Sequence, residues 1–348
     1  MTLTESRSLD TYRMKIQKKS KSSKDQFEHA YRKYTEFAKD PAKRISQLKE
    51  LPDTASLDEL QNYYNFLTNH PRTNKIYTQQ LAKFFRYMGI KVSNEMIKEE
   101  VSFVKIPQEE LHPLTIEEIR TILNACLYRK KALFLTQLSS GIRIGELVQL
   151  RKKHFQFIPE AQIYQIKIPT HIAKFQKART TFVSREATKA LQMILRQKND
   201  EDLVFGTCTD AFTAKKSEIA YLNNVKDRVG LNQKYESNKV DQIGTHSFRA
   251  FFITQISRHD PNLAKLLAGQ KGYLLQYDRI SDQDKLELYK KYESDLLVFD
   301  DSRKDQKIKE LQQATQLYQD ALKAKDEAIK QRDTILDLYK KDFILYDN

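Results

Sequence analysis

The chain has 348 residues, 40% of them hydrophobic, and its 60 Lys and Arg against 46 Asp and Glu give a formal net charge of +14. This length allows two domains with ordinary cores, and the charge favours an acidic partner, most simply nucleic acid, although a basic protein without such a partner stays an alternative. The two cysteines, Cys126 and Cys208, exclude a cysteine metal cluster and a disulfide framework, and no apolar run approaches the roughly 20 residues of a membrane helix, so we expect a soluble protein of the cytoplasm.

Residues 1–24 are rich in Lys, Arg and Ser and contain few large apolar residues. Such a composition predicts a mobile basic arm. On DNA the arm would add phosphate contacts; alternatively, it only keeps the chain in solution.

Residues 25–103 have the pattern of a small module of four helices. Aromatic residues recur at helical spacing near its start: Phe27, Tyr31, Tyr34 and Phe37. Pro41 then predicts a break, and Ser56 with Glu59 predicts a capping box at the start of the second helix. The third and fourth helices are expected over residues 75–88 and 95–101. The aromatic residues are expected to form the core of this module rather than to stack on bases.

Basic side chains of the same module are candidates for a face that binds the DNA backbone, although each alone could simply be solvated. These candidates are Lys33, Arg72, Lys75, Lys83 and Arg86.

Residues 104–112 show no periodicity and predict a linker to a second domain, residues 113–300. Thr115 and Glu118 predict a capping box at the start of that domain. Alternating apolar residues then predict strands, and helical spacing predicts the rest. The strands are expected over 155–158, 163–168 and 180–183, and the helices over 116–127, 130–139, 213–228, 247–257 and 260–268, with one more after Ser184. The expected fold class is mainly α with a small antiparallel β-sheet, α+β.

The last segment, residues 301–348, contains ten basic and ten acidic residues, so the whole excess of positive charge lies in residues 1–300. Apolar residues recur every seven positions along it, interrupted by Lys325 and Arg332. This repeat predicts a long helix. The helix either forms a coiled coil or folds back onto its own domain or a neighbouring protomer.

The stretch LTQLSSGIRIGELVQL, residues 135–150, predicts a helix, a tight turn at Gly141 and the start of a second helix. Arg143 stands at this junction, with Glu146 one turn later. An arginine there adds its planar set of donors to free backbone N–H groups, a combination that binds phosphate. About a hundred residues later, His246 and Arg249 in HSFR offer the same chemistry.

Between the second and third expected strands lies a flexible basic segment that contains Lys174 and Lys177, with Arg179 just beyond it. Lys177 and Arg179 are candidates to follow the DNA backbone, and a generic basic loop is the alternative for all three residues.

In this order, GIRIGELVQL, the lysine between two strands, HSFR and a downstream tyrosine resemble the tyrosine recombinases, the phage-integrase family. The sequences KFQKARTTFVSREA and GQKGYLLQYDRISDQDKLELYKKYESDL further resemble integrases of archaeal mobile elements. The resemblance covers residues 113–297, and the module at 25–103 is similar to that family's core-binding domain. It does not extend to the arm or to the tail.

The resemblance implies a site-specific integrase that cuts and rejoins double-stranded DNA through a 3′-phosphotyrosine link, without metal or cofactor. Arg143 and Arg249 would clamp the scissile phosphate, and Lys174 would protonate the leaving 5′-oxygen. His246 would be a general base or a hydrogen-bond donor to the phosphate. Glu146 is expected to support Arg143.

Two features depart from the family pattern. Gln270 stands where a second histidine or a tryptophan is usual; it can donate a hydrogen bond to phosphate but cannot transfer a proton. The nucleophile is also ambiguous, because several tyrosines lie downstream: Tyr273, Tyr277, Tyr289 and Tyr292. Family spacing favours Tyr277, with Tyr289 second, although core packing is the better interpretation of Tyr289.

We expect the enzyme to act as a homotetramer on two DNA sites. Two alternatives stay open. A type IB topoisomerase shares the chemistry but works as a monomer, and a non-catalytic DNA-binding relative would keep only the phosphate clamp.

Overall fold

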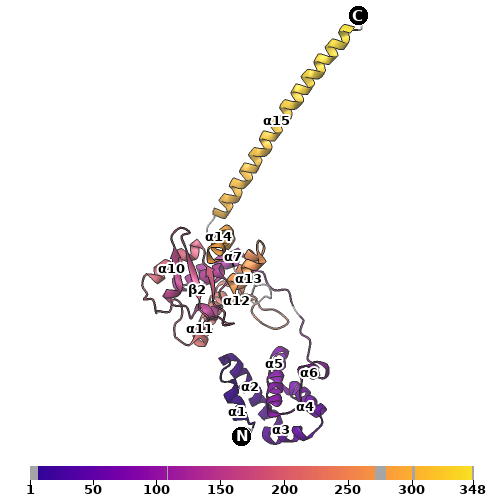
Figure 1. Ribbon diagram of the computed structural model, residues 1–348, viewed down its shortest axis with the longest axis vertical. Helices are drawn as coiled ribbons and strands as arrows, with labels where there is room; N and C mark the ends of the chain where they lie inside the picture. Colours follow the sequence, from indigo (N-terminus) through magenta and orange to yellow (C-terminus); the bar gives the residue numbers. More distant parts are fainter. Residues whose placement is uncertain (1–6, 108, 271–279, 300–301, 347–348) are drawn as a thin grey trace. The chain divides into compact units, whose positions relative to one another are not determined.

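The computed structural model describes residues 7–107, 109–270, 280–299 and 302–346, and it consists of two compact units. The first comprises Met1–Glu110 with Tyr235–Val240, and the second comprises Leu111–Lys234 with Asp241–Asn348. Within the described residues, none of the helices combines the length and the apolar character needed to span a membrane. Figure 1 shows the helices of the first unit, α1–α6, gathered into one bundle.

The first unit is entirely helical in its described part. Its helices are α1 (Leu9–Ile16), α2 (Lys21–Ala38), α3 (Pro41–Glu50), α4 (Asp53–Phe66), α5 (Pro71–Met88) and α6 (Asn94–Glu100). As expected, the aromatic residues form the core: Phe27, Tyr34, Phe84 and Phe85 are all at most 1% exposed. Gly89, in the left-handed conformation at φ 93°, ends α5.

The mobile arm predicted for residues 1–24 is wrong for its described part, because α1 and the start of α2 lie there. Ser8 caps α1 by accepting a hydrogen bond from the Thr11 N–H. Tyr12 and Ile16, four residues apart, are buried on the same face of the helix. The Tyr12 ring lies 4.8 Å from that of Phe27, so the apolar face of α1 packs onto the bundle. Two large apolar side chains at helical spacing outweigh the basic composition.

The capping box predicted from Ser56 and Glu59 is also wrong. Helix α4 begins at Asp53, so both residues lie inside it and are buried. The Glu59 carboxylate accepts hydrogen bonds from the Tyr34 hydroxyl at 2.9 Å and from Arg44 Nη2 at 2.7 Å. Pro41 begins α3 rather than only marking a break, so residues 25–103 contain one helix more than predicted.

The second unit confirms the predicted class, mainly α with a small antiparallel sheet. Its elements are α7 (Ile116–Asn124), α8 (Tyr128–Ser140), α9 (Ile144–Leu147), η1 (Lys152–His154), β1 (Phe155–Ile158), β2 (Ile163–Ile168), β3 (Arg179–Phe182), α10 (Arg185–Leu195), α11 (Ala211–Val229), α12 (Thr245–Ser257), α13 (Pro261–Ala268), α14 (Asp282–Tyr292), η3 (Glu293–Leu296) and α15 (Ser302–Tyr346). The capping box of Thr115 and Glu118 and the cap at Ser184 are present as predicted.

Helix α8 lies at the centre of the second unit. It packs against α10 and α12, and the Phe134 ring stacks on Phe248 of α12 at 5.2 Å. The strands pair in the order β1-β2-β3, antiparallel throughout, with Phe155 opposite Ile166 and Ile166 opposite Thr181. This packing fixes the end of α8, from which the candidate site begins.

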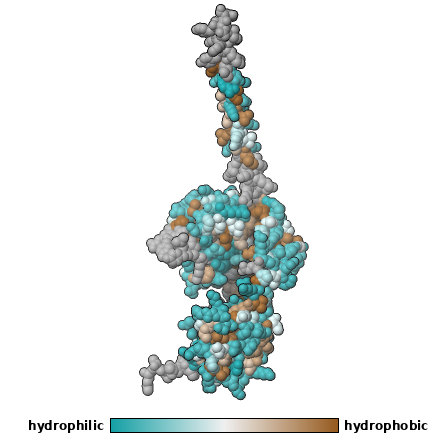
Figure 2. All heavy atoms as spheres, turned by 90° about the vertical axis from the view of Figure 1, so that its right-hand side faces the viewer, coloured by the Kyte–Doolittle hydropathy of each residue, from teal (hydrophilic) through white to brown (hydrophobic). Residues whose placement is uncertain are grey.

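The tail forms one helix, α15, as predicted. Its described apolar side chains are exposed, among them Leu311, Tyr318 and Leu322. Figure 2 shows brown apolar residues scattered among hydrophilic ones along this helix.

Replacing Tyr12 with alanine tests the docking of α1. Tyr12→Ala removes the ring that contacts Phe27 and Phe84, and burying such a ring contributes about 3 kcal/mol. We expect trypsin to cleave after Arg13 and Lys15 at least about tenfold faster than in the unchanged chain. Met14→Ala, which changes a side chain 67% exposed on the same helix, is the control. Equal cleavage rates in all three proteins would contradict the docking of α1 and support a mobile arm.

Candidate active site

The turn at Gly141 orients the first arginine of the site. Gly141 has φ 65°, and a Cβ placed on it would lie 2.3 Å from the Phe252 ring, so both backbone and space demand glycine. The chain then passes through Ile142 and Ile144, which are buried on either side of Arg143. The Arg143 side chain, 21% exposed, is therefore held at the surface of the core by its neighbours.

Arg143 and Arg249 converge on two consecutive carbonyl groups. Arg143 Nη2 donates to the Gly269 carbonyl at 3.1 Å, and Arg249 Nη1 donates to the Ala268 carbonyl at 2.7 Å and to the Gly141 carbonyl. Arg249 is 2% exposed. Burial, together with the charges of Arg143 and Arg179, lowers the pKa of Arg249 to about 10, so it stays charged near neutral pH. The two guanidinium groups thus form one positively charged site.

Glu146 connects this site to the segment between β2 and β3. Its buried carboxylate lies 3.3 Å from Arg143 Nη1 and 2.6 Å from Arg179 Nη2, and it accepts a hydrogen bond from the Lys174 backbone N–H at 3.1 Å. Burial alone would raise the pKa of Glu146, but the hydrogen bond and charge of Arg179, with Lys174 and Arg143, keep it below the ordinary value. The ionised carboxylate supports all three groups.

The prediction that Arg179 follows the DNA backbone is wrong. Its side chain is only 9% exposed, and besides binding Glu146 it donates to the Leu267 carbonyl at 3.1 Å. A Cβ on Gly269, which has φ 63°, would lie 2.7 Å from the Arg179 guanidinium. Arg179 therefore lies beneath the arginine pair. No clear signal for this was present in the sequence, because Arg179 directly precedes the strand expected over 180–183, whereas the strand in the structure begins at Arg179.

Lys174 lies exposed between β2 and β3, with only its backbone tied to Glu146. Phe175, which the sequence analysis did not select, is 42% exposed. Its ring centre lies 5.2 Å from the Arg143 guanidinium carbon and 5.7 Å from Lys174 Nζ. An aromatic face between two cations attracts both. Lys177 is exposed further along the same connection.

His246 lies in the first turn of α12, one turn before Arg249, and is exposed. Partial burial of the ring lowers the pKa of His246, and the charges of Arg249, Arg143 and Lys174 lower it further. Four residues from three separate parts of the chain therefore lie within electrostatic reach of one another. Gln270, the residue after Gly269, is half-buried, and its backbone N–H donates to the Lys265 carbonyl at 2.9 Å.

The tyrosine candidates divide into two groups. Tyr273 and Tyr277 lie outside the described residues. Tyr289 is fully buried, and its hydroxyl donates to the Ser139 carbonyl at 2.8 Å, while burial raises its pKa well above the ordinary value. Tyr289 as second choice of nucleophile is therefore wrong, and core packing is confirmed for it. Tyr292 stacks on the His259 ring at 4.5 Å.

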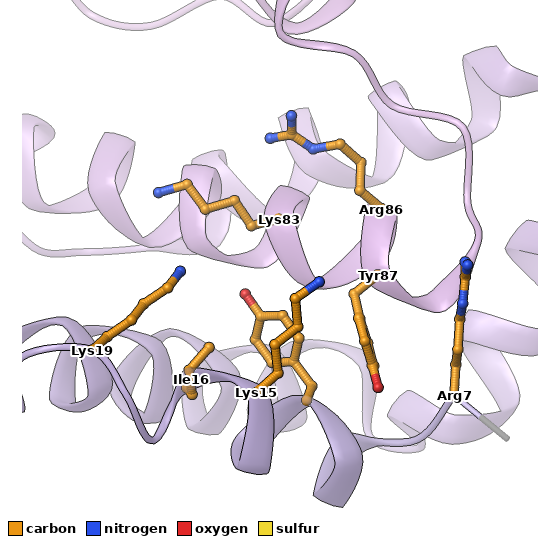
Figure 3. A pocket seen from close by; sticks show the side chains of 8 residues that line it. Arg7, Lys15, Ile16, Lys19, Lys83, Arg86 and Tyr87 are labelled. Atoms are coloured by element: carbon orange, nitrogen blue, oxygen red, sulfur yellow. The ribbon is translucent and has the colours of Figure 1, made fainter. Parts of the chain in front are cut away.

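The basic candidates of the first unit differ in their surroundings. Lys33 pairs with Glu36 at 2.7 Å, which offsets its charge. Arg72 and Lys75 are exposed, and Lys75 lies over the Phe103 ring at 4.9 Å. Lys83 and Arg86 line a pocket together with Lys15 and Lys19 (Figure 3). Among the residues that the structure describes, no group of three or more His, Cys, Asp or Glu could hold a metal ion.

Comparison with known proteins gives a family match for one part of the chain and a similar fold for most of it. Residues 112–268 match the model of the phage integrase family. No curated protein matches the chain. A lambda integrase fragment, solved as a dimer bound to a COC′ core site, is 13% identical with a TM-score of 0.52, covering 78% of this chain and 97% of that one.

Two further solved structures have a similar fold. XerH site-specific recombinase, in a post-cleavage complex with palindromic difH substrate, is 19% identical with a TM-score of 0.50, covering 82% of this chain and 80% of that one. The integrase of the Tn1549 transposon, in complex with circular intermediate DNA, is 16% identical with a TM-score of 0.50, covering 80% of this chain and 94% of that one.

Neutralising Glu146 tests its role in holding the arginines. Glu146→Gln leaves the buried Arg179 without its anionic partner, which we expect to lower the free energy of unfolding by about 3 kcal/mol. In a urea-melt cycle with Arg179→Gln and the double variant, the double variant should recover part of this loss. Glu36→Gln, which opens a surface pair with Lys33, should cost less than about 1 kcal/mol. Strictly additive losses at Glu146 and Arg179 would contradict the coupling.

The pKa of His246 tests the convergence of charges. In the DNA-free protein we expect an NMR titration midpoint below the ordinary value of 6.5. Lys174→Gln removes one of the three nearby cations and should raise that midpoint. Lys177→Gln removes the same charge from the same connection and should leave it unchanged. A midpoint at or above 6.5 without DNA would show that the cations lie apart from the ring.

Proposed function

We propose that this chain is a member of the phage integrase family, whose model matches residues 112–268, and that it is a site-specific recombinase that cuts and rejoins double-stranded DNA. The observation that carries the proposal is the convergence of Arg143 and Arg249 on the carbonyls of Gly269 and Ala268. The presence of DNA in the lambda integrase, XerH and Tn1549 integrase structures supports the choice of partner.

The arginine pair is the clamp for the scissile phosphate. Neutral carbonyls bind both guanidinium groups, and Glu146 pairs with Arg143 and Arg179 but not with Arg249, so the site keeps net positive charge. In a buried setting an uncompensated cation binds an anion strongly, and more strongly still as charge develops on a pentacovalent phosphate. The clamp therefore stabilises the transition state without a metal ion.

Proton transfer is divided between His246 and Lys174. The phenol oxygen of Tyr277 attacks phosphorus, and its proton passes to His246, whose pKa is lowered by partial burial and by the surrounding cations. The bond from phosphorus to the 5′-oxygen breaks as the Lys174 ammonium gives that oxygen a proton. Rejoining runs the same steps in reverse. The phosphotyrosine link conserves the bond, so no nucleotide is consumed.

Gln270 binds the phosphate in this scheme but does not transfer a proton. It follows Gly269, whose carbonyl binds Arg143, so its amide belongs to the same turn of the chain. Proton transfer then depends on His246 and Lys174 alone. The family's usual histidine at this position would add a second titrating group, which this chain lacks.

The helical unit, residues 25–103, holds DNA as a core-binding domain, and the enzyme acts as a tetramer on two DNA sites. Helix α15 contributes to assembly through its exposed apolar residues, among them Leu311, Tyr318 and Leu322. Packing of the tail on a neighbouring protomer uses the same residues. Sedimentation of the full chain with and without DNA separates these arrangements from a tail that packs on its own domain.

A nicked suicide DNA substrate tests the reaction. We expect a covalent protein–DNA adduct from the unchanged chain and none from Tyr277→Phe, because only phenol oxygen can form the link. Tyr289→Phe should still form the adduct, while losing about 1–3 kcal/mol of stability because the buried Ser139 carbonyl loses its donor. Mass spectrometry of the trapped peptide identifies the tyrosine. An adduct that survives Tyr277→Phe would contradict the assignment, and relaxation of supercoiled DNA by monomers would favour the topoisomerase.

A further inference from the structure

Phe175 lies where the connection between β2 and β3 leaves the core. Ala173 is still buried, at 6% exposed, and its carbonyl accepts a hydrogen bond from the Gln176 N–H at 2.9 Å. This bond closes a tight turn with Lys174 and Phe175 as its two central residues. The Lys174 N–H is also bound, to the Glu146 carboxylate at 3.1 Å. The backbone of the turn is therefore fixed beside the candidate active site.

The Phe175 ring lies within interaction distance of two cations. Its centre is 5.2 Å from the Arg143 guanidinium carbon and 5.7 Å from Lys174 Nζ. Phe175 is 42% exposed, so burial in the core contributes little to its placement. The attraction between the negative face of the ring and the two positive charges can instead hold the side chains together.

Repulsion opposes the placement of the Lys174 ammonium beside the arginine pair. Arg143 and Arg249 converge on neighbouring carbonyls, so a third cation beside them is repelled. Glu146 binds Lys174 through its backbone, and among the residues that the structure describes no carboxylate pairs with Lys174 Nζ. The flexible four-carbon stem of a lysine also allows the ammonium many positions. The contact with the ring counteracts both effects.

We propose that Phe175 is a positioning residue for Lys174, because its ring holds the ammonium beside Arg143, where the 5′-oxygen leaves the scissile phosphate. The inference rests on the proposed function, in which Lys174 is the acid of the cleavage step. In that step the bond from phosphorus to the 5′-oxygen breaks and its electron pair goes to the oxygen. A proton of the Lys174 ammonium then forms the new O–H bond. An acid that is held near the oxygen transfers its proton more often.

An aromatic ring suits this task better than a carboxylate would. A carboxylate beside Lys174 would hold the ammonium, but its negative charge would repel the phosphate and make the lysine a weaker acid. A ring has no net charge, and the negative potential of its face still attracts a cation. The contact with Phe175 therefore leaves the positive charge of the site intact.

The test compares two leaving groups in single-turnover cleavage at saturating DNA. One suicide substrate has the natural 5′-oxygen at the scissile phosphate, and the other has sulfur in its place. Because a thiol has a pKa of about 8.5, a thiolate leaves without receiving a proton. A variant that impairs only proton delivery is therefore slow on the oxygen substrate and normal on the sulfur substrate.

Phe175→Leu keeps an apolar side chain but removes the ring. We expect it to cleave the oxygen substrate about fivefold more slowly than the unchanged chain and the sulfur substrate at the same rate. Phe175→Tyr retains the ring and should cleave both at the rates of the unchanged chain. Phe66→Leu makes the same change at a phenylalanine that is 43% exposed in the first unit, and it should alter neither rate. Thermal melts establish that the three variants fold.

Three results would overturn the inference. Phe175→Leu might cleave the oxygen substrate at the full rate, which would show that the ring is dispensable. Equal slowing on both substrates would show that the ring acts through the phosphate clamp or the fold. A Phe175→Tyr variant as slow as Phe175→Leu would show that the aromatic face is not what holds the lysine.

The pKa of His246 provides a readout that needs no cleavage. Partial burial lowers this pKa, and nearby cations, Lys174 among them, lower it further. Release of the ammonium in Phe175→Leu should therefore raise the pKa in the DNA-free protein, as followed by NMR, and Phe175→Tyr should leave it unchanged. If the unchanged chain forms no adduct on either substrate, the proposed function fails, while this comparison still decides whether the ring holds Lys174. A pKa that Phe175→Leu leaves unchanged would overturn the inference.

Discussion

A buried carboxylate shared by two arginines and a backbone amide is the interaction on which the candidate site depends. Taking Glu146 and Arg179 out of water is costly, and the cost is offset only if every donor and acceptor finds a partner. The contacts satisfy that condition: Glu146 binds Arg143, Arg179 and the Lys174 N–H, and Arg179 also binds the Leu267 carbonyl. One ionised group thus fixes the relative positions of α9, the β2–β3 connection and the residues after α13.

Carbonyl groups accept the hydrogen bonds of Arg249, as the Glu146 carboxylate does for Arg179, but they carry no net charge. The carbonyls of Gly141 and Ala268 satisfy the N–H groups of Arg249 without cancelling its charge. The site is therefore rigid and still positive. Two glycines in the left-handed conformation make this possible, since Gly141 and Gly269 bring the backbone close to Phe252 and Arg179. Electrostatic stabilisation of a phosphate needs that combination of order and uncompensated charge.

Local patterns predicted most of the fold and part of the site. Alternating apolar residues indicated the strands, and the turn at Gly141 followed from a glycine between two helical runs, because both signals act within a few residues. The errors arose where a distant partner decides. Tyr12 folds α1 by packing on other helices, and Glu59 is buried because Tyr34 and Arg44 reach it from α2 and α3. From the sequence, Arg179 is indistinguishable from the other cations of the basic segment, because its partner Glu146 lies on α9.

The two units carry positive charge in two settings, which differ in how far the charged side chains are buried. In the second unit Arg249 is buried and Arg143 is half-buried, so their charges act over a short distance in a low dielectric. In the first unit Lys15, Lys19 and Lys83 are exposed, and salt screens them. Exposed lysines give affinity that tolerates movement along a strand, whereas buried arginines demand close alignment. Under the proposed function, an enzyme that holds DNA through cleavage, exchange and rejoining would use both kinds of contact, the tolerant kind for affinity and the aligned kind for the reacting phosphorus.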